Sequence, residues 1–254
     1  MSKRYKGLLF DLCGTLMQYR IDRMPLIEFE GKQVHTTTPL LYACFLEFDR
    51  GKVSYERFHT EFVNTTEAIA RKRDASGKEI LSATRFESFL NRLNADLGKR
   101  RNEIQRLLKD IHLARVAKCL EFLPRHRDLL LAWGKTHRIG LVTNFDDTQT
   151  VRNVLSRERI TDLFDVIIIS AEFGLRKPRR EIFLRACDDI GASVSETLFV
   201  GDSWESDVVG AKSIGLDTAW INPHQIPQPD KGRKADYHFS DLAELDHVLN
   251  QRHS

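Results

Sequence analysis

The sequence of 254 residues has few cysteines, no long hydrophobic run and little net charge. Its four cysteines lie tens of residues apart, which excludes a disulfide framework and favours a reducing, cytoplasmic setting. The apolar run Leu8–Phe10 near the start is too short for a signal peptide. No segment reaches the roughly 18 apolar residues of a membrane span. We therefore expect a protein with no membrane partner.

The charge balance argues against nucleic acid as a partner. Lys and Arg number 39 and Asp and Glu number 36, which leaves a net charge of only +3. Proteins that bind phosphate backbones concentrate a much larger basic excess. Hydrophobic residues make up 41% and charged residues 30% of the chain, which is typical of a globular protein and excludes extensive disorder.

Short apolar runs bounded by polar or turn residues predict the strands of one parallel sheet. From residue 120 onward these runs alternate with helical patterns, which is the βαβ signature of a sheet covered by helices on both faces. The fold class is therefore α/β, with a Rossmann-like three-layer core. The expected strands are Gly7–Phe10, Ile139–Val142, Val166–Ile169, Leu198–Val200, Thr218–Ile221 and Tyr237–Phe239. The expected helices are Arg125–Thr136, Asp147–Glu158, Arg179–Ile190, Asp207–Ile214 and Leu242–Asn250.

The pattern changes between the first strand and residue 120. A hairpin turning at Gly31 is followed by amphipathic stretches that predict helices and leave the second half of this region without a strand. The expected domains are a core of residues 1–16 and 120–254 and a mostly α-helical insert of residues 17–119. The expected helices of the insert are Pro39–Phe48, Tyr55–Arg73, Glu79–Leu97 and Asn102–Leu120.

Polar residues follow four of the expected strands directly. In an open parallel sheet the ligand site lies beyond the carboxyl ends of the strands, so these residues are expected to converge. They provide carboxylates, a hydroxyl, an amide and a cation, which together suit a phosphate and a metal ion. The candidates are Asp11 and Cys13 after the first strand, Thr143 and Asn144 after the second, Lys177 after the third, and Asp202 and Asp207 after the fourth.

Several of these residues also have a simpler interpretation. Thr143 and Asn144 are common turn residues, and Asp207 could cap a helix that begins near it. Cys13 is expected to behave as an inert small hydrophobe rather than a reactive nucleophile. Trp204, in the last of these segments, could line the entrance to a site or serve in packing.

The four segments, in this order, resemble the motifs of the haloacid dehalogenase-like hydrolase superfamily, and the insert resembles its helical cap. The resemblance implies that Asp11 is the catalytic nucleophile and forms an aspartyl-phosphate. It implies a Mg²⁺ cofactor held by Asp11, Asp202 and the backbone carbonyl of Cys13, with Asp207 as a ligand or behind the ligands. Thr143 and Asn144 would hold phosphate oxygens, and Lys177 would neutralise charge on the nucleophile and the phosphate.

The departure from the family pattern is Cys13, where its phosphatases usually have a second aspartate as general acid and base. A thiol is a poor acid near neutral pH, and losing such help typically lowers the rate about 10² to 10⁴-fold. Three functions remain open. The favoured one is hydrolysis of a small phosphorylated metabolite. The others are dehalogenation of a 2-haloacid or cleavage of a phosphonate, and a catalytically weak protein that binds Mg²⁺ and phosphate.

Overall fold

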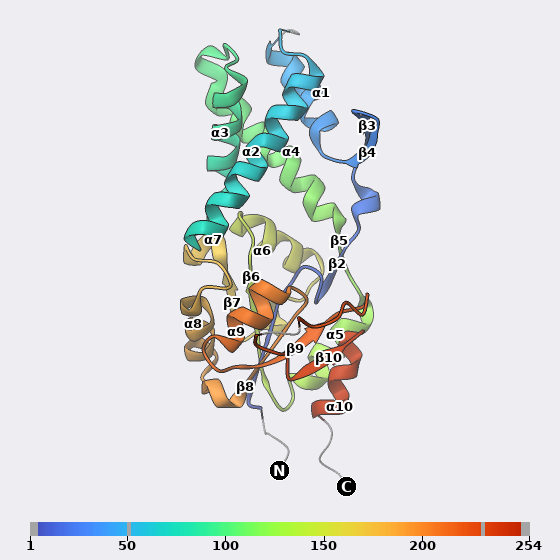
Figure 1. The fold of residues 1–254 in the computed structure, drawn as a ribbon, viewed down its shortest axis with the longest axis vertical. Helices are drawn as coiled ribbons and strands as arrows, with labels where there is room; N and C mark the ends of the chain where they lie inside the picture. The colour runs from blue at the N-terminus through green and yellow to red at the C-terminus, as the bar shows by residue number, and fades with distance from the viewer. Residues whose placement is uncertain (1–4, 50–51, 230–231, 250–254) are drawn as a thin grey trace. The chain divides into compact units, whose positions relative to one another are not determined.

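The computed structural model describes residues 5–49, 52–229 and 232–249, and the chain in it forms two compact units (Figure 1). The first, here called the core unit, consists of Met1–Tyr19 and Glu121–Ser254. The second, here called the helical unit, is Arg20–Leu120. The sequence placed the two divisions after residues 16 and 119. No helix within the described ranges is long and apolar enough to cross a membrane.

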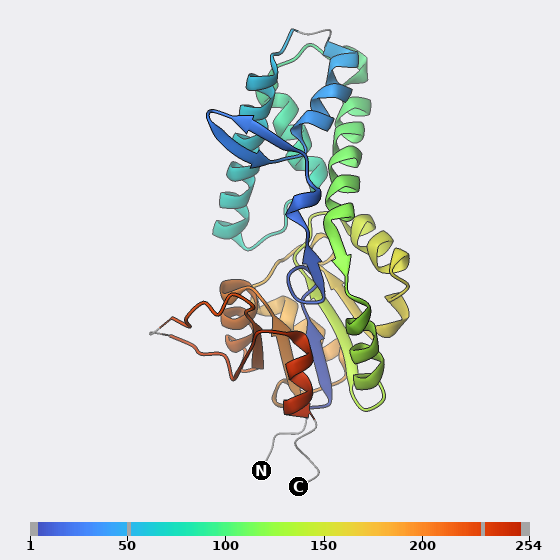
Figure 2. The same ribbon diagram turned by 90° about the vertical axis from the view of Figure 1, so that its right-hand side faces the viewer.

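The core unit contains a six-stranded parallel sheet in the order β10-β9-β8-β1-β6-β7. Figure 2 shows β1, in blue, running within the sheet rather than at its edge. This arrangement confirms the predicted α/β class with a Rossmann-like sheet. The strands are β1 (Gly7–Phe10), β6 (Arg138–Thr143), β7 (Val166–Ile169), β8 (Thr197–Gly201), β9 (Asp217–Ile221) and β10 (Tyr237–Phe239).

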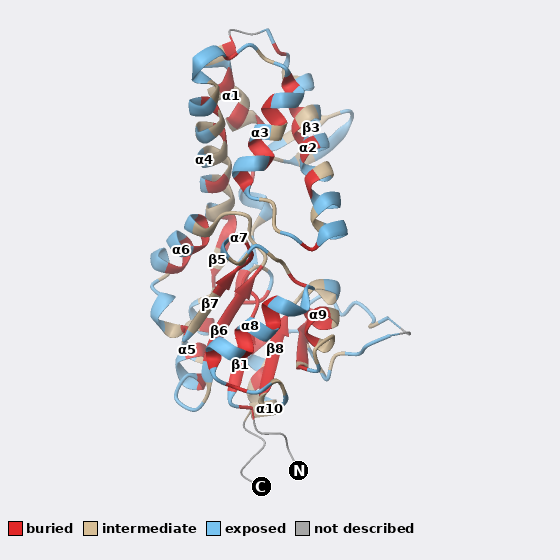
Figure 3. Cartoon of the chain, turned by 90° about the vertical axis from the view of Figure 1, so that its left-hand side faces the viewer, coloured by how far each residue is buried: buried red, intermediate tan, exposed pale blue. Residues whose placement is uncertain are grey.

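The continuous apolar runs form strands because both faces of the sheet are covered by helices. Every residue of β1 and β8 is buried, and Figure 3 shows these strands coloured as buried. Successive side chains of a strand point to opposite faces. Leu9 accordingly packs in the cluster under α8 (Arg180–Ile190), whereas Phe10 stacks on Trp133 of α5 (Pro124–Trp133) at 5.7 Å.

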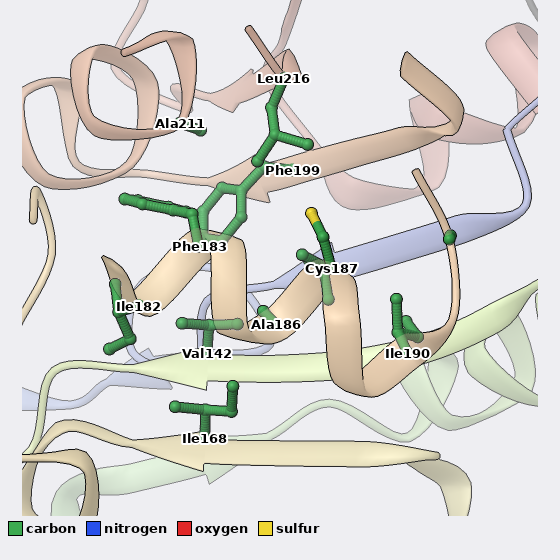
Figure 4. Close-up of a cluster of buried hydrophobic side chains, with 12 residues drawn as sticks. Val142, Ile168, Ile182, Phe183, Ala186, Cys187, Ile190, Phe199, Ala211 and Leu216 are labelled. Atoms are coloured by element: carbon green, nitrogen blue, oxygen red, sulfur yellow. The ribbon is translucent and has the colours of Figure 1, made fainter. Parts of the chain in front are cut away.

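The cluster on the α8 side joins the central strands into one apolar layer. Figure 4 shows side chains of α8 lying over strands β6, β7 and β8. Because these strands are packed from both sides, their carboxyl ends are held at fixed places relative to one another. The members of the cluster labelled in Figure 4 are Val142, Ile168, Ile182, Phe183, Ala186, Cys187, Ile190, Phe199, Ala211 and Leu216.

Among the other helices of the core unit, one lies within its predicted range, one was not predicted and two are shorter than expected. They are α6 (Thr148–Arg157), the short α7 (Ser170–Phe173), α9 (Gly210–Lys212) and α10 (Leu245–Leu249). The helix expected over Asp207–Ile214 is wrong in its start. A π-helical turn over Trp204–Val209 comes first and leads into α9. The expected end of the last helix, Asn250, lies outside the described residues.

Two short strands, β2 (Met17–Tyr19) and β5 (Leu120–Phe122), were not predicted and form a two-stranded sheet. Each has only three residues. In β2 only the first of these is buried, so no alternation reveals it.

The helical unit begins with a 3-10 turn over Ile21–Arg23, which is followed by a hairpin of β3 (Leu26–Phe29) and β4 (Lys32–His35). The hairpin turns at Glu30 and Gly31, both of which adopt positive φ angles, as the tight turns of hairpins require. Helices α1 (Thr38–Asp49), α2 (Tyr55–Ser76), α3 (Ser82–Leu93) and α4 (Arg101–Cys119) follow and pack around a shared apolar cluster. The third expected helix was too long, because Asn94 adopts a φ of 49° and ends α3 there.

Candidate active site

Asp11 lies directly past the end of β1, and it is placed there by the neighbouring strands. Its backbone N–H donates to the carbonyl of Val200 in β8 at 2.9 Å. The adjacent pairs of β1 with β6 and β8 bring the carboxyl ends of all three strands together. The Asp11 side chain is only 9% exposed. A carboxylate is therefore buried at the sheet edge where a ligand site was expected.

Lys177 approaches from the loop between α7 and α8 and joins two carboxylates. Its Nζ lies 2.6 Å from Oδ1 of Asp11 and 2.7 Å from Oδ1 of Asp207. Only 1% of the lysine side chain is exposed. Burial by itself would lower the pKa of Lys177, but the two carboxylates outweigh it and the pKa is raised. The lysine therefore remains a cation in this interior.

Asp207 is held inside the π-helical turn. Its Oδ2 accepts a hydrogen bond from the backbone N–H of Ser203 at 2.9 Å. A β-carbon on Gly201 would lie 2.4 Å from that same oxygen, so glycine is required there. The helix-cap role left open for Asp207 belongs instead to Ser203, whose side chain accepts from the N–H of Ser206.

Asp202 follows β8 and faces the loop after β1. The hydroxyl of Thr15 donates to its Oδ1 at 3.4 Å. Gly14 adopts a φ of 89°, and a β-carbon there would lie 2.2 Å from Oδ2 of Asp202. The backbone carbonyl of Asp202 accepts from the indole N–H of Trp220 at 2.7 Å, a contact that the sequence does not predict. The Asp202 side chain therefore packs against the backbone at Gly14, and its main chain is held by the bond to Trp220.

The three carboxylates carry more negative charge than one lysine can balance. Burial, together with repulsion from Asp207 and Asp202, outweighs the opposing effect of Lys177 and raises the pKa of Asp11 to about 7. Burial, followed by repulsion from Asp207, raises the pKa of Asp202 to about 6. One oxygen of each carboxylate lies within 4.8 Å of the others. Hard oxygen donors around an excess of negative charge fit a divalent cation such as Mg²⁺.

Thr143 and Asn144 lie at the end of β6, which pairs with β1, the strand that Asp11 follows. Thr143 is buried as the last residue of that strand. The side-chain amide of Asn144 binds both the backbone N–H and the backbone carbonyl of Lys177. Its Oδ1 accepts from the lysine N–H at 2.8 Å and its Nδ2 donates to the lysine carbonyl at 2.9 Å. In this structure Asn144 therefore positions the lysine segment, in addition to the phosphate role predicted for it.

Cys13 lies two residues past Asp11 and is half-buried. It forms a β-bridge with Met17. Burial raises the pKa of the thiol, and the charges of Asp11 and Asp202 raise it further. The thiol is consequently neutral near physiological pH and is unsuited to act as a base.

Trp204 packs against Trp220 with ring centroids 4.8 Å apart. Of the two roles considered for it, packing is the one for which the structure gives a contact.

Comparison with known proteins gives one family. The sequence model of the haloacid dehalogenase-like hydrolases matches residues 5–215. The pyrimidine 5'-nucleotidase YjjG of Escherichia coli (strain K12) is 37% identical over 167 residues, which are 65% of this chain and 69% of that protein.

Two further proteins are similar over nearly the whole chain. YfnB of Bacillus subtilis (strain 168) is 26% identical over 98% of this chain and 97% of its own. Its crystal structure, described as bound to magnesium, has a TM-score of 0.63. The 2-haloacid dehalogenase of Pseudomonas syringae pv. Tomato DC3000 has a TM-score of 0.72 at 21% identity, covering 97% of this chain and 99% of its own. At that identity the likeness concerns the fold alone.

Proposed function

Since the chain belongs to the haloacid dehalogenase-like hydrolase family, we propose that it hydrolyses a small phosphate monoester through a covalent intermediate on Asp11. The observation that carries this proposal is the buried ion pair between Asp11 and Lys177 with two more carboxylates beside it. A carboxylate held next to a cation at a strand end suits attack on a phosphoryl group, whose charge the cation also attracts.

The reaction takes place in two balanced steps. A carboxylate oxygen of Asp11 attacks phosphorus, the bond from phosphorus to the ester oxygen breaks, and the departing alkoxide takes a proton from solvent to leave as the alcohol. Water then attacks phosphorus of the aspartyl-phosphate, and the bond from phosphorus to the Asp11 oxygen breaks. Inorganic phosphate leaves, the carboxylate is restored, and the proton lost by the water returns to solvent. Lys177 offsets negative charge on Asp11 in both steps, and the buried hydroxyl of Thr143 is the proposed donor to a phosphate oxygen.

The residues that would hold Mg²⁺ are Asp11, Asp202 and the backbone carbonyl of Cys13, with Asp207 as a further ligand or behind them. The bound ion would offset charge on the phosphate. The excess of carboxylates over lysine supports this assignment, and so does the relative YfnB, whose crystal structure is described as bound to magnesium.

Cys13 limits the leaving groups that the site can serve. With its pKa raised, the thiol is a weak proton donor to the departing alcohol, so phosphates of acidic alcohols should react best. Dehalogenation is less well supported, because displacement of halide by a carboxylate needs no cation, whereas Asp202 and Asp207 are both present.

We further propose that the helical unit carries the residues that determine specificity among phosphate monoesters.

An activated aryl phosphate tests the proposal. We expect turnover that requires Mg²⁺ and falls about 10³-fold or more in Asp11→Asn. The matched control is Asp128→Asn, because Asp128 lies exposed on α5 of the same unit. Acid-quenched protein incubated with labelled substrate should carry phosphate in the wild type and none in Asp11→Asn. Equal turnover in wild type and Asp11→Asn would contradict the proposed hydrolysis through Asp11. It would support the alternative function, a protein that only binds phosphate.

A further inference from the structure

An aromatic column lies behind Asp202 and plays no part in the reaction described above. Its centre is Trp220 of β9, which is buried. Trp204 of the π-helical turn packs edge-on against it at 4.8 Å. His238 of β10 stacks on it at 4.9 Å with an interplanar angle of 21°. Two strands and the turn that carries Asp207 therefore meet at one indole ring.

The indole N–H of Trp220 continues the hydrogen bonding of the sheet beyond its last pair. The register of β8 with β9 ends at Gly201 opposite Trp220. Asp202 is one residue further on, past the ladder. Its carbonyl accepts from the indole at 2.7 Å, so a side chain holds the segment where backbone pairing has ended. The direction in which the Asp202 carboxylate points follows from that backbone.

His238, the ring of the column that lies on β10, is held by a hydrogen bond of its own. The Nδ2 of Asn222 donates to Nε2 of His238 at 2.8 Å. The Oδ1 of the same amide accepts from the N–H of Ile226 at 3.1 Å, which sets the orientation of the amide. Asn222 is buried, and its own N–H donates to Phe239 in β10 at 2.7 Å. His238 therefore has little freedom to turn away from the indole ring.

We propose that Trp220 is a positioning residue for the metal site. Its N–H holds the Asp202 carbonyl, and the rings of Trp204 and His238 keep the indole in place. The inference rests on the proposed function, because it assumes that Asp202 is a Mg²⁺ ligand. Groups that orient a ligand of a metal typically change metal affinity about 10- to 100-fold when they are removed.

Trp220→Phe keeps a ring in the column and removes only the donor. Its matched control is Trp133→Phe, because Trp133 is also buried in the core unit and donates its indole N–H to Asp246 at 2.6 Å. Thermal unfolding of the protein at a series of Mg²⁺ concentrations measures the affinity without turnover. We expect about tenfold weaker Mg²⁺ binding in Trp220→Phe and wild-type binding in Trp133→Phe.

Turnover of the aryl phosphate provides the second measurement. If Trp220 positions the metal ligand, the Mg²⁺ concentration for half-maximal activity rises about tenfold in Trp220→Phe. Saturating Mg²⁺ then restores kcat, while KM for the substrate is unchanged. A purely structural role would lower the melting temperature and leave the Mg²⁺ dependence unchanged.

The outcomes separate the two proposals. If the wild type shows no stabilisation by Mg²⁺, both the metal site and the positioning role are wrong. If the wild type binds Mg²⁺ and Trp220→Phe binds it equally well, only the positioning role is wrong. Equal losses of affinity in Trp220→Phe and Trp133→Phe would also overturn it. Should Trp220→Phe not fold, Trp204→Leu, which removes one supporting ring from the column and keeps the donor, must weaken Mg²⁺ binding for the proposal to stand.

Discussion

Replacing Lys177 by methionine removes the ammonium group that lies between two buried carboxylates and keeps an apolar stem of similar length. In the wild type Nζ lies 2.6 Å from Asp11 and 2.7 Å from Asp207, with 1% of the side chain exposed. Removing one partner of a buried ion pair destabilises a protein by about 3–5 kcal/mol. At about 2–4 °C per kcal/mol for a chain of this size, the melting temperature of the metal-free protein should fall by about 6–20 °C near pH 8.

The loss should shrink as the pH is lowered, and the sign follows from Asp11. Its pKa in the folded protein is about 7, whereas an unfolded aspartate titrates near 3.9. A carboxyl whose pKa is raised on folding destabilises the fold above the folded-state value and less so below it, because the folded state takes up the proton first. Without Lys177 the pKa of Asp11 rises further. Protonation then removes one uncompensated charge, so the deficit near pH 5 should be smaller than that near pH 8.

Scanning calorimetry of metal-free protein at the two pH values measures both effects, and Lys6→Met is the matched control. Lys6 pairs with Glu196 at 2.6 Å, but its side chain is 62% exposed. Exposed pairs contribute about 0–1 kcal/mol, so the control should unfold close to the wild type. Our account of the buried cation is refuted if Lys177→Met loses no more stability than Lys6→Met. It is also refuted if the deficit is the same near pH 5 as near pH 8.

Three shorter predictions concern the same site. Gly14→Ala should reduce Mg²⁺ stabilisation measured by thermal shift, because its β-carbon would lie 2.2 Å from Asp202; Gly31→Ala has a comparable positive φ in open space and should leave that stabilisation unchanged. Cys13→Asp should raise aryl phosphate turnover about 10²-fold or more and Cys13→Ser should not, and no gain in the aspartate variant would contradict a missing acid. Stabilisation by Mg²⁺ should be weaker near pH 5 than near pH 8, because protons compete for Asp11 and Asp202, whose pKa values are about 7 and about 6; equal stabilisation at both pH values would argue against these ligands.

The sheet could be predicted from the sequence because its strands form short apolar runs, which in the central strands β1 and β8 are buried at every residue. A run such as Val166–Ile169 has one plausible place in a protein of this composition, and the structure puts β7 there. The strands β2 and β5 could not be found in this way. Each is three residues long, which is too short for an alternation of buried and exposed residues to be recognised in the sequence.

The π-helical turn could not be predicted for a different reason. The spacing of five residues between Asp202 and Asp207 is compatible with an ordinary helix start at the second aspartate. The turn instead begins at Trp204, with the Asp207 carboxylate between the Ser203 N–H and the Lys177 ammonium. Those contacts depend on a lysine 30 positions away in the chain, so local propensity contains no information about them.

The site illustrates which part of function the order of residues can predict. Carboxylates after neighbouring parallel strands must lie near one another, so Asp11 and Asp202 could be grouped from their positions alone. Strand order does not determine the hydrogen-bond partner of an amide or an indole, because such a side chain can reach several backbone groups. Asn144 binds the backbone of Lys177 at both ends, and this leaves the buried hydroxyl of Thr143 as the stronger candidate to donate to a phosphate oxygen. Of the pair predicted to bind phosphate, Thr143 is therefore the stronger candidate for a direct contact. Asn144 is expected to act mainly by positioning Lys177.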